Sequence, residues 1–481
     1  MFPLVFSITL FSLVYTGGAL INEAAFSPDH IISKDVAIIG GGASGTYAAI
    51  RLREDLKTSI ILIEKEPELG GHVETYFVPE TQTTLEYGVQ SYIRYGHAVD
   101  FFARFNVSIV PFAPRRLTNV NVNAETGALL EGYIPPTNNA TTEAFQRWLK
   151  IVEKYESILN PGYWEFPAPD DIPSDLLLPF GEFAAAHNIA AAVPRIMTIS
   201  GIGVGGIKTI LTLYVAQAFG APITRGVIAN SLFVPEGSNS LLYQRALTQL
   251  GSDVLLSSQV RRAVRDETGI RLVVKSKRGS YLIKAKRLLY SAAPSLHNLA
   301  NFDVDEKENK VFGTWTRSWS FLGVAHIPCI LENYGISYVS LEAVPSDHLA
   351  VRNSPFSLGL TSTGPAGLGL FRVLFASNYS LTYDEAKATI QQNVQNLVNS
   401  GTLNYTGDCA VEFKTFTDHH SVTSEQTSEQ LRAGFIQDLY ALQGYRSTWY
   451  TGSLWGVRYS SNVWAYTDTV LPRLLADISG G

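Results

Sequence analysis

The stretch that decides the fold is Asp35-Val36-Ala37-Ile38-Ile39-Gly40-Gly41-Gly42-Ala43-Ser44-Gly45, together with Ile60-Ile61-Leu62-Ile63-Glu64. An apolar strand runs directly into a glycine turn, a helical pattern follows from Thr46 to Leu56, and a second apolar strand then ends in an acid. Strand, glycine turn, helix, strand and acid in this order form the dinucleotide-binding fingerprint. An isolated Gly-x-Gly-x-x-Gly run is weak evidence, but the complete set predicts a bound nucleotide cofactor.

Each residue type in this fingerprint has a physical role at a pyrophosphate. Gly40 permits the tight turn off the strand, Gly42 lets the backbone approach the phosphates, and Gly45 lets the helix pack closely on the strand. Ser44 lies at the start of the helix, whose unpaired N–H groups and positive dipole end attract the pyrophosphate. Glu64 ends the second strand, where its carboxylate can accept the ribose hydroxyls. We therefore expect these five residues to form the cofactor site.

Size and composition favour a globular protein with two or more domains. The chain has 481 residues, 17% of them charged, and a net charge of −6. No Lys/Arg run is interleaved with aromatic residues, so nucleic acid is not an expected partner. The two cysteines, Cys329 and Cys409, lack the spacing of metal ligands, and we expect no metal site. They form one disulfide or stay two buried free thiols, and the sequence leaves both open.

The N-terminus has the composition of a secretory signal peptide. Residues 1–20 carry no charge, residues 2–15 are nearly all apolar, and Thr16-Gly17-Gly18-Ala19 supplies small residues for cleavage. The basic residues that usually precede the apolar run are missing, which leaves an uncleaved N-terminal anchor as the alternative. Asn-x-Ser/Thr sequons begin at Asn106, Asn139, Asn378 and Asn404. We predict a secreted or secretory-pathway glycoprotein with no membrane span in the mature chain.

The chain leaves the fold of the fingerprint and later returns to it. The later elements that we expect are a second strand-and-turn run at Gly226–Ile228 and Val234–Ser238, a helix over Leu241–Leu250, a strand over Asp253–Leu256, a hairpin of Gly269–Lys277 with Ser280–Ile283, and a buried strand over Arg287–Ala292.

These elements predict an α/β protein built from two domains. The Rossmann-like cofactor domain is discontinuous, over residues 35–110, 226–305 and 436–481. An inserted α+β domain over residues 111–225 and 306–435 would bind substrate or cap the cofactor. The oligomeric state is not predictable from these patterns.

A second glycine cluster, Gly201-Ile202-Gly203-Val204-Gly205-Gly206, also matches Gly-x-Gly-x-x-Gly. No Asp or Glu occurs from Ile207 to Pro235, so the ribose acceptor is missing, and the preceding strand candidate, Ile196–Ile199, is short. We interpret the cluster as a turn or helix-packing site in the inserted domain, with the lining of a substrate pocket as the alternative.

Two segments after the fingerprint resemble those of the flavin amine oxidase superfamily. Glu64–Thr75 resembles its glycine-pair segment, with His72 following Gly71 where the superfamily usually has an arginine that meets the FAD pyrophosphate. Leu85–Ser91 resembles its acid-x-Gly segment near the flavin. The resemblance implies that Gly71 and His72 contact FAD, and covalent attachment of His72 to the flavin is the alternative.

The C-terminal end carries a third resemblance. Gly444–Ser453 is similar to the superfamily's final strand and turn beneath the flavin, with Gly452-Ser453 where Gly-Asp is frequent. A helix pattern over Ser461–Leu475 follows, and its N-terminal dipole would stabilise a negatively charged reduced flavin. The resemblance implies that Gly452 and Ser453 contact FAD. It also implies that the backbone of Val260 holds the adenine, unless Val260 is an ordinary buried strand residue.

In detail, the motifs resemble most the fungal branch of β-cyclopiazonate dehydrogenase-like enzymes, over Asp35–Leu475. This resemblance implies an FAD-dependent oxidoreductase that removes a hydride from a C–H bond of a small, ring-bearing metabolite. Desaturation or oxidative ring closure would follow, with O2 or another acceptor taking the electrons. A prenylcysteine-lyase-like thioether oxidase or a flavin-dependent double-bond isomerase is the first alternative. A secreted protein that keeps a degenerate FAD site without activity is the second.

The catalytic residues are the least determined part. Tyr450 and Trp464 are candidates for substrate contact because their segments match flavin-proximal motifs, although each is also a plausible core residue. His419, in Asp418-His419-His420, is a candidate general base, with a surface or core position as the alternative. Lys414 is a further candidate for holding a water near the flavin. The position where amine oxidases commonly have a cage tyrosine approximately corresponds to Val463, which weakens a plain amine-oxidase interpretation.

Overall fold

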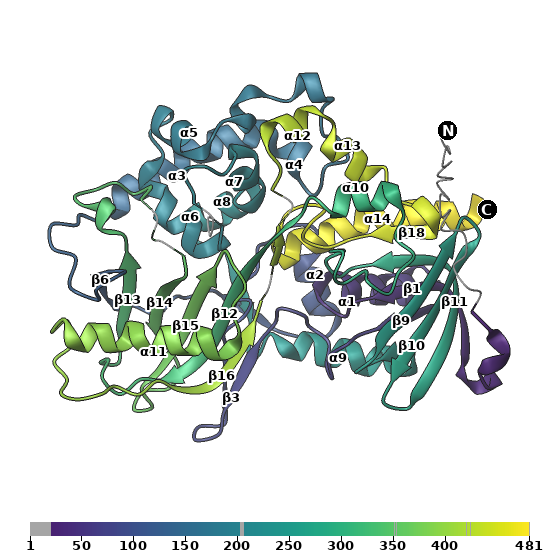
Figure 1. The fold of residues 1–481 in the computed structure, drawn as a ribbon, viewed down its shortest axis with the longest axis horizontal. Helices are drawn as coiled ribbons and strands as arrows, with labels where there is room; N and C mark the ends of the chain where they lie inside the picture. Colours follow the sequence, from purple (N-terminus) through teal and green to yellow (C-terminus); the bar gives the residue numbers. More distant parts are fainter. Residues whose placement is uncertain are drawn as a thin grey trace, which may run out of the picture.

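Two seven-stranded sheets organise the molecule, one in each half, with helices packed around them (Figure 1). The computed structural model describes residues 21–202, 206–350, 352, 354–419, 421–423 and 425–480. The predicted signal peptide, 1–20, lies outside the described residues. The predicted α/β class is confirmed.

The first sheet contains the fingerprint strands. Its order is β8-β2-β1-β11-β10-β9, with β18 beside β11; β9, β10 and β11 pair antiparallel and the other pairs are parallel. Residues 36–38 in the middle of β1 are fully buried, as expected for a parallel strand that is covered on both faces. Its strands are β1 (Ile31–Ile39), β2 (Ile60–Ile63), β8 (Val254–Leu255), β9 (Gln259–Asp266), β10 (Gly269–Ser276), β11 (Gly279–Tyr290) and β18 (Thr448–Tyr450).

The second sheet is built from the inserted segments. Its order is β16-β12-β15-β14-β13-β6, with β17 beside β12, and only the β6–β13 pair is parallel among the pairs of the described residues. Its strands are β6 (Thr118–Asn123), β12 (Thr316–His326), β13 (Tyr334–Val339), β14 (Phe356–Ser362), β15 (Leu370–Ser377), β16 (Glu412–Asp418) and β17 (Ser421–Thr423).

Helix α11 (Tyr383–Asn399) covers one face of the second sheet (Figure 1). Phe371 and Phe375 of β15 share a buried cluster with Ile390 and Val394 of α11. Because side chains alternate along a strand, Arg372 and Leu374 point to the opposite face. The second sheet therefore has one face closed by α11 and one face turned toward the other half of the molecule.

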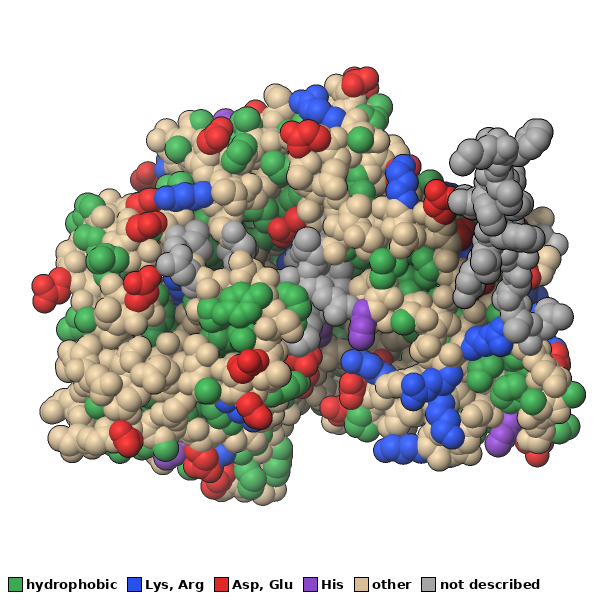
Figure 2. Space-filling model, viewed as in Figure 1, with side chains coloured by type: hydrophobic (Ala, Val, Ile, Leu, Met, Phe, Trp, Pro, Cys, Tyr) green, Lys and Arg blue, Asp and Glu red, His purple; other side chains and the backbone are tan. Residues whose placement is uncertain are grey.

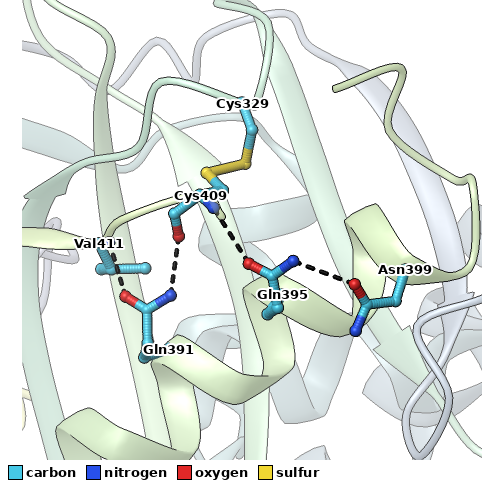
Figure 3. The surroundings of a disulfide bond; sticks show 6 residues. All are labelled: Cys329, Gln391, Gln395, Asn399, Cys409 and Val411. Carbon is cyan, nitrogen blue, oxygen red and sulfur yellow. Dashed lines mark hydrogen bonds between the residues drawn. A yellow bond between two sulfur atoms is a disulfide. The ribbon is translucent and has the colours of Figure 1, made fainter. Parts of the chain in front are cut away.

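A disulfide joins the ends of β12 and β16 in this second half. Cys329 and Cys409 are bonded, with their Cα atoms 5.8 Å apart, so the pairing that the sequence left open is formed. Gln391 of α11 donates to the carbonyl of Cys409 (2.7 Å), and the backbone N–H of Cys409 donates to Gln395 (3.0 Å) (Figure 3). The loop that carries Cys409 is thus tied both to the sheet and to α11.

Helices between residues 138 and 228 pack with the first half rather than with the second sheet. Trp148 of α3 and Phe180 of α5 belong to the same buried cluster as the strands of the first sheet. The remaining helices are α1 (Ala43–Ile50), α2 (Ala98–Arg104), α3 (Asn138–Val152), α4 (Glu156–Leu159), α5 (Phe180–Ala186), α6 (Val193–Ser200), α7 (Thr212–Ala218), α8 (Ala221–Ile228), α9 (Ser240–Leu250), α10 (Glu306–Phe312), α12 (Ser428–Arg432), α13 (Phe435–Tyr440) and α14 (Ser460–Gly480). A small hairpin of β3 (Thr75–Val78) with β4 (Thr83–Glu86) and an antiparallel pair of β5 (Ile109–Pro111) with β7 (Phe233–Pro235) complete the fold.

Two local predictions were wrong. Ile196–Ile199 lies in α6 rather than in a strand, because a proline in the first helical turn starts the helix and Gly201, at φ +65°, ends it. Gly226–Ile228 ends α8, which again begins with a proline in its first turn. The buried strand predicted over Arg287–Ala292 is confirmed as far as Tyr290, but it is the end of β11 rather than a separate strand, because β11 pairs continuously with the nine-residue β1.

Other predicted elements are confirmed. The helix predicted over Leu241–Leu250 is α9, and the predicted hairpin is the β10–β11 pair, which closes at Ser276 opposite Gly279. The predicted turn at the second glycine cluster is described at Gly201 and Gly206, whereas residues 203–205 lie outside the described residues. The predicted domain boundaries stay predictions. Among the described residues, no helix is both long and apolar enough to cross a membrane.

Candidate cofactor and substrate site

The glycine turn after β1 has a backbone that only glycine accommodates. Gly40 has φ +100°, in the left-handed region that side chains disfavour. A Cβ atom on Gly45 would lie 1.8 Å from the carbonyl oxygen of Gly40, so α1 packs against the turn more closely than any side chain allows. Gly42 is the N-cap of α1 and offers no side-chain cap. The first N–H groups of α1 are therefore oriented to receive an anion.

The glycine pair after β2 faces this turn. A Cβ atom on Gly71, which has φ +58°, would lie 2.9 Å from the Cα atom of Gly42. A Cβ atom on Gly42 would meet only Gly71, at 3.7 Å. Two backbones without side chains thus form a narrow cradle, which fits a pyrophosphate that must be held by backbone N–H groups.

Glu64 lies beside the cradle at the end of β2. Its carboxylate is 7% exposed and accepts the backbone N–H of Gly41 (2.5 Å) and of Glu66 (2.8 Å). A carboxylate has about four lone-pair positions, so two remain for other donors such as ribose hydroxyls. The free acceptor positions of Glu64 therefore fit the hydroxyl groups of a dinucleotide's ribose.

The final strand meets the same turn from the opposite side. Gly452 has φ +113°, and a Cβ atom there would lie 3.2 Å from the carbonyl oxygen of Ser291 and 3.6 Å from Oγ of Ser44. Ser291 in turn donates to the carbonyl oxygen of Gly40 (2.8 Å). Ser453, next in the chain, is exposed. The fold therefore brings together three segments that lie hundreds of residues apart, as the motif resemblance requires.

Val260 lies in β9, opposite Val274 of β10. Its carbonyl oxygen accepts the side-chain amide of Asn301 (3.0 Å). The backbone N–H of Ser258, just before β9, donates to the carbonyl of Glu64 (2.8 Å), so the start of β9 is close to the ribose corner. Contact between Val260 and the adenine stays a prediction.

A pair of stacked histidines lies next to the glycine cradle. The rings of His72 and His419 are 4.3 Å apart and inclined by 17°. The His72 side chain is accessible to solvent, yet protein atoms surround it on most sides. This combination indicates that His72 lines an indentation rather than the outer surface. The enclosing protein and the neighbouring His419 lower the pKa of His72, so its imidazole is neutral at pH 7. His420 lies outside the described residues.

Polar side chains from both halves surround these histidines. Glu74 lies 3.7 Å from Nε2 of His419 and accepts the hydroxyl of Tyr87 (3.0 Å). Burial raises the pKa of Tyr87 to about 12, so this hydroxyl keeps its proton. Tyr87 also hydrogen-bonds Thr415 of β16 (2.9 Å). The open face of the second sheet therefore touches the segment that follows the glycine pair, and Figure 2 shows the surface indented between the two halves.

Two of the predicted substrate contacts lie in the core instead. Trp464 of α14 is fully buried, and its Nε1–H donates to the carbonyl of Ala43 (3.0 Å). Tyr450 is 1% exposed, and its hydroxyl donates to Glu308 (3.1 Å). Both positions argue against substrate contact and for a role in packing α14 and β18 onto the first sheet.

Lys414 is paired with Glu412 (2.5 Å) on β16, so its ammonium is directed to a carboxylate of its own strand. Sequence reasoning did not single out Glu74 and Tyr87, although both lie in segments that resemble flavin-proximal motifs, and it missed Arg372. The alternation along β15 gave a signal for Arg372, because a charged residue interrupts an otherwise apolar strand there.

The geometry defines a class of protein, namely one with a Rossmann-like dinucleotide-binding fold and a second half that is built on its own sheet. Residues 38–105 match the family model of an NAD(P)-binding Rossmann-like domain. The chain belongs to the fungal FAD-dependent oxidoreductases that include β-cyclopiazonate dehydrogenase, and its cofactor is FAD. It is 32% identical to the FAD-dependent oxidoreductase pigF of Monascus ruber, over 96% of each chain. It is 32% identical to β-cyclopiazonate dehydrogenase of Aspergillus oryzae, over 92% of this chain and 93% of that one.

Solved structures with this fold have very different sequences. The fatty acid isomerase from P. acnes that produces conjugated linoleic acid has a TM-score of 0.70 at 15% identity, covering 92% of this chain and 98% of that one. Putrescine oxidase bound to putrescine has a TM-score of 0.61 at 14% identity, covering 93% and 100%. These similarities establish the fold and no more than the fold.

Proposed function

We propose that this enzyme removes a hydride from a C–H bond of a small, ring-bearing metabolite and thereby desaturates or cyclises it. The observation that carries the proposal is the extent of the similarity to β-cyclopiazonate dehydrogenase, which runs over 92% of this chain. It includes the second sheet and its open face, not only the glycine cradle. A shared substrate half supports a shared type of reaction, whereas a shared cradle alone supports only a shared cofactor.

Bound FAD supplies the hydride acceptor for this chemistry. The residues of the chain then have three tasks: to orient the substrate C–H bond, to exclude water and to take the proton that leaves with the hydride. His419 is suited to the last task, because its Nε2 lies 3.7 Å from Glu74, which stabilises an imidazolium. Loss of one hydride and one proton leaves a new double bond in the substrate, and O2 or another acceptor finally takes the two electrons.

We propose in addition that the protein enters the secretory pathway. The asparagines of all four sequons, Asn106, Asn139, Asn378 and Asn404, are exposed, as attachment of glycans requires. The bonded Cys329–Cys409 pair favours an oxidising compartment. Expression in a fungal host tests this directly, since a secreted protein would lose mass on enzymatic deglycosylation and begin after residue 20.

The decisive experiment is anaerobic mixing of the FAD-loaded enzyme with a library of ring-bearing metabolites. A substrate should bleach the oxidised flavin, and one equivalent of product with two fewer hydrogens should form per flavin. A product that is an isomer of the substrate, formed without bleaching, would assign an isomerase instead. Sulfur-containing products would assign a thioether oxidase. An FAD-loaded protein that chemical reductants bleach but that no member of a broad library reduces would favour the non-catalytic alternative.

A further inference from the structure

Arg372 is a charged residue on the open face of the second sheet. In the register of that sheet it lies between Val324 of β12 and Thr361 of β14, and Thr415 of β16 lies beyond Val324. Directly paired residues share a face, so these four side chains form one row across the sheet. Because Thr415 hydrogen-bonds Tyr87, the row faces the half of the molecule that contains the glycine cradle.

The guanidinium of Arg372 has little to compensate its charge. Its Nε–H donates to the carbonyl oxygen of Tyr87 (3.3 Å), and the four Nη hydrogens have no acceptor among the residues that the structure describes. Burial lowers the pKa of Arg372 to about 10, with no carboxylate contributing, so the group still carries its charge at neutral pH. Arg372 is half-buried, so a cation without a counter-charge is costly at this position, and an anion beside it would be stabilised.

Leucine side chains also lie on the face that carries Arg372, beside the threonines of its row. Leu322, Leu370 and Leu374 lie on the same face and belong to or pack against one small hydrophobic cluster. This combination of an apolar wall with one fixed bidentate donor is the usual composition of a small-molecule site. A planar guanidinium matches a planar oxyanion, because two parallel N–H groups meet two oxygens.

A short series of contacts connects the glycine cradle with Arg372. Tyr87 precedes Gly88, and a Cβ atom on Gly88 would lie 2.3 Å from the carbonyl oxygen of His72. His72 follows Gly71, which forms the cradle with Gly42. Arg372 therefore contacts the segment that leads away from the pyrophosphate site, on the side where the histidine pair is found.

We propose that Arg372 binds a carboxylate, or an equally delocalised oxyanion, of the substrate and thereby directs the C–H bond to be oxidised toward His419. The inference rests on the proposed function for the identity of this space as the substrate site. It makes the enzyme selective for acidic metabolites. A neutral analogue of the same shape would leave the guanidinium unpaired and bind more weakly.

The test uses oxidised holoenzyme and a matched pair of ring-bearing probes, indole-3-acetate and indole-3-acetamide. Binding is followed by perturbation of the flavin spectrum and by thermal stabilisation, and neither readout needs turnover. The carboxylate should bind about tenfold to hundredfold more tightly than the amide. Arg372→Gln should remove that preference, and Arg372→Lys should restore it partly, because a point charge lacks the bidentate fork.

The control variant is Lys387→Gln. Lys387 lies over Phe416 on the face of the same sheet that α11 covers, so its loss removes a positive charge without touching the open face. It should leave the preference for the carboxylate unchanged. The wild-type comparison of acid with amide stands even if Arg372→Gln fails to fold.

Three results would overturn the proposal. The first is equal affinity of the wild type for acid and amide, and the second is an unchanged preference in a folded Arg372→Gln protein. The third is a changed flavin spectrum in Arg372→Gln without ligand, together with an equal loss of affinity for acid and amide, which would assign the arginine to the flavin. Since none of these measurements involves oxidation of substrate, they fail or succeed independently of the anaerobic bleaching experiment.

Discussion

The two sheets of this molecule carry their functional information in different ways. In the first half it lies in positions without side chains, because Gly42 and Gly71 leave a cradle that any substituent would fill. In the second half we expect it in the side chains of one sheet face, where Arg372 contacts the segment around Tyr87. A cofactor shared by many enzymes is held by backbone, whereas a particular substrate is selected by side chains. We therefore expect substitutions at the cradle glycines to abolish FAD binding, and substitutions on the open face of the second sheet to change substrate specificity.

The largest effect should come from filling the cradle. In Gly42→Val the added Cβ meets only Gly71, at 3.7 Å, so the protein should fold with an unchanged far-UV circular dichroism spectrum. The space for the pyrophosphate is lost, however, and FAD affinity should fall by about 100-fold or more. Equilibrium dialysis against FAD measures this. A variant that keeps wild-type affinity would show that the pyrophosphate lies elsewhere.

Gly45→Ala provides the contrast within the same turn. Its Cβ would lie 1.8 Å from the carbonyl oxygen of Gly40, so this variant should lose both stability and cofactor. Although alanine is smaller than valine, Gly45→Ala should affect both stability and FAD binding, because backbone atoms already occupy the space beside Gly45.

The second largest effect concerns the other half. Replacement of both Cys329 and Cys409 by serine opens a loop with a sequence separation of 80 residues. The stability of the second half should fall by about 2–4 kcal/mol, while FAD should remain bound at 25 °C because the cradle lies in the first half. Thermal unfolding followed separately by circular dichroism and by release of flavin fluorescence measures the two halves. An unchanged unfolding temperature would contradict the structural role of the disulfide.

A smaller effect is expected from Tyr450→Phe. The variant loses the hydrogen bond to Glu308, but Glu308 keeps two hydrogen bonds from Arg265, at 2.6 and 2.8 Å, and so stays satisfied. Stability should fall by about 1 kcal/mol. Because Tyr450 is a core residue, kcat/KM for an identified substrate should change by less than about twofold. A loss of kcat at unchanged stability would instead indicate that Tyr450 contacts the substrate.

The smallest effect is a pH dependence from His72, whose pKa in the folded protein is lowered below its unfolded value. As the pH falls below about 6.5, the unfolded chain binds a proton that the folded chain does not, so His72 destabilises the fold only on the acid side. His72→Asn should therefore gain stability relative to the wild type as the pH is lowered. Unfolding temperatures of the apoproteins across this range measure the difference. A stability difference between His72→Asn and the wild type that does not change with pH would contradict the assignment.

The sequence predicted the first half much better than the second. Gly40, Gly42 and Gly45 were assigned correctly to one turn, because each follows from a local backbone requirement that the sequence displays, and Glu64 was assigned correctly to the strand end beside that turn. The substrate side depends on contacts between residues far apart, such as Arg372 with Tyr87, and no local pattern encodes such a contact. Only the register of β12, β14 and β15 brings those residues together.

Two incorrect expectations from the sequence have different physical causes. Trp464 was considered for substrate contact from its motif position, but its helical face points into a cluster of aromatic rings that only the packed structure defines. Ile196–Ile199 has the β-branched composition of a strand, and the proline that starts α6 overrides it. Motif position predicted proximity to the cofactor and not the direction of a side chain.

The visible spectrum of the purified protein, before and after acid precipitation, tests the central claim most directly, namely that the glycine half holds FAD for an oxidoreductase reaction. The account predicts a yellow protein with an oxidised-flavin spectrum whose colour passes into the supernatant on acid treatment. A yellow pellet would keep the cofactor but reassign His72 as a covalent link. A folded, colourless protein that does not take up added FAD would contradict the account.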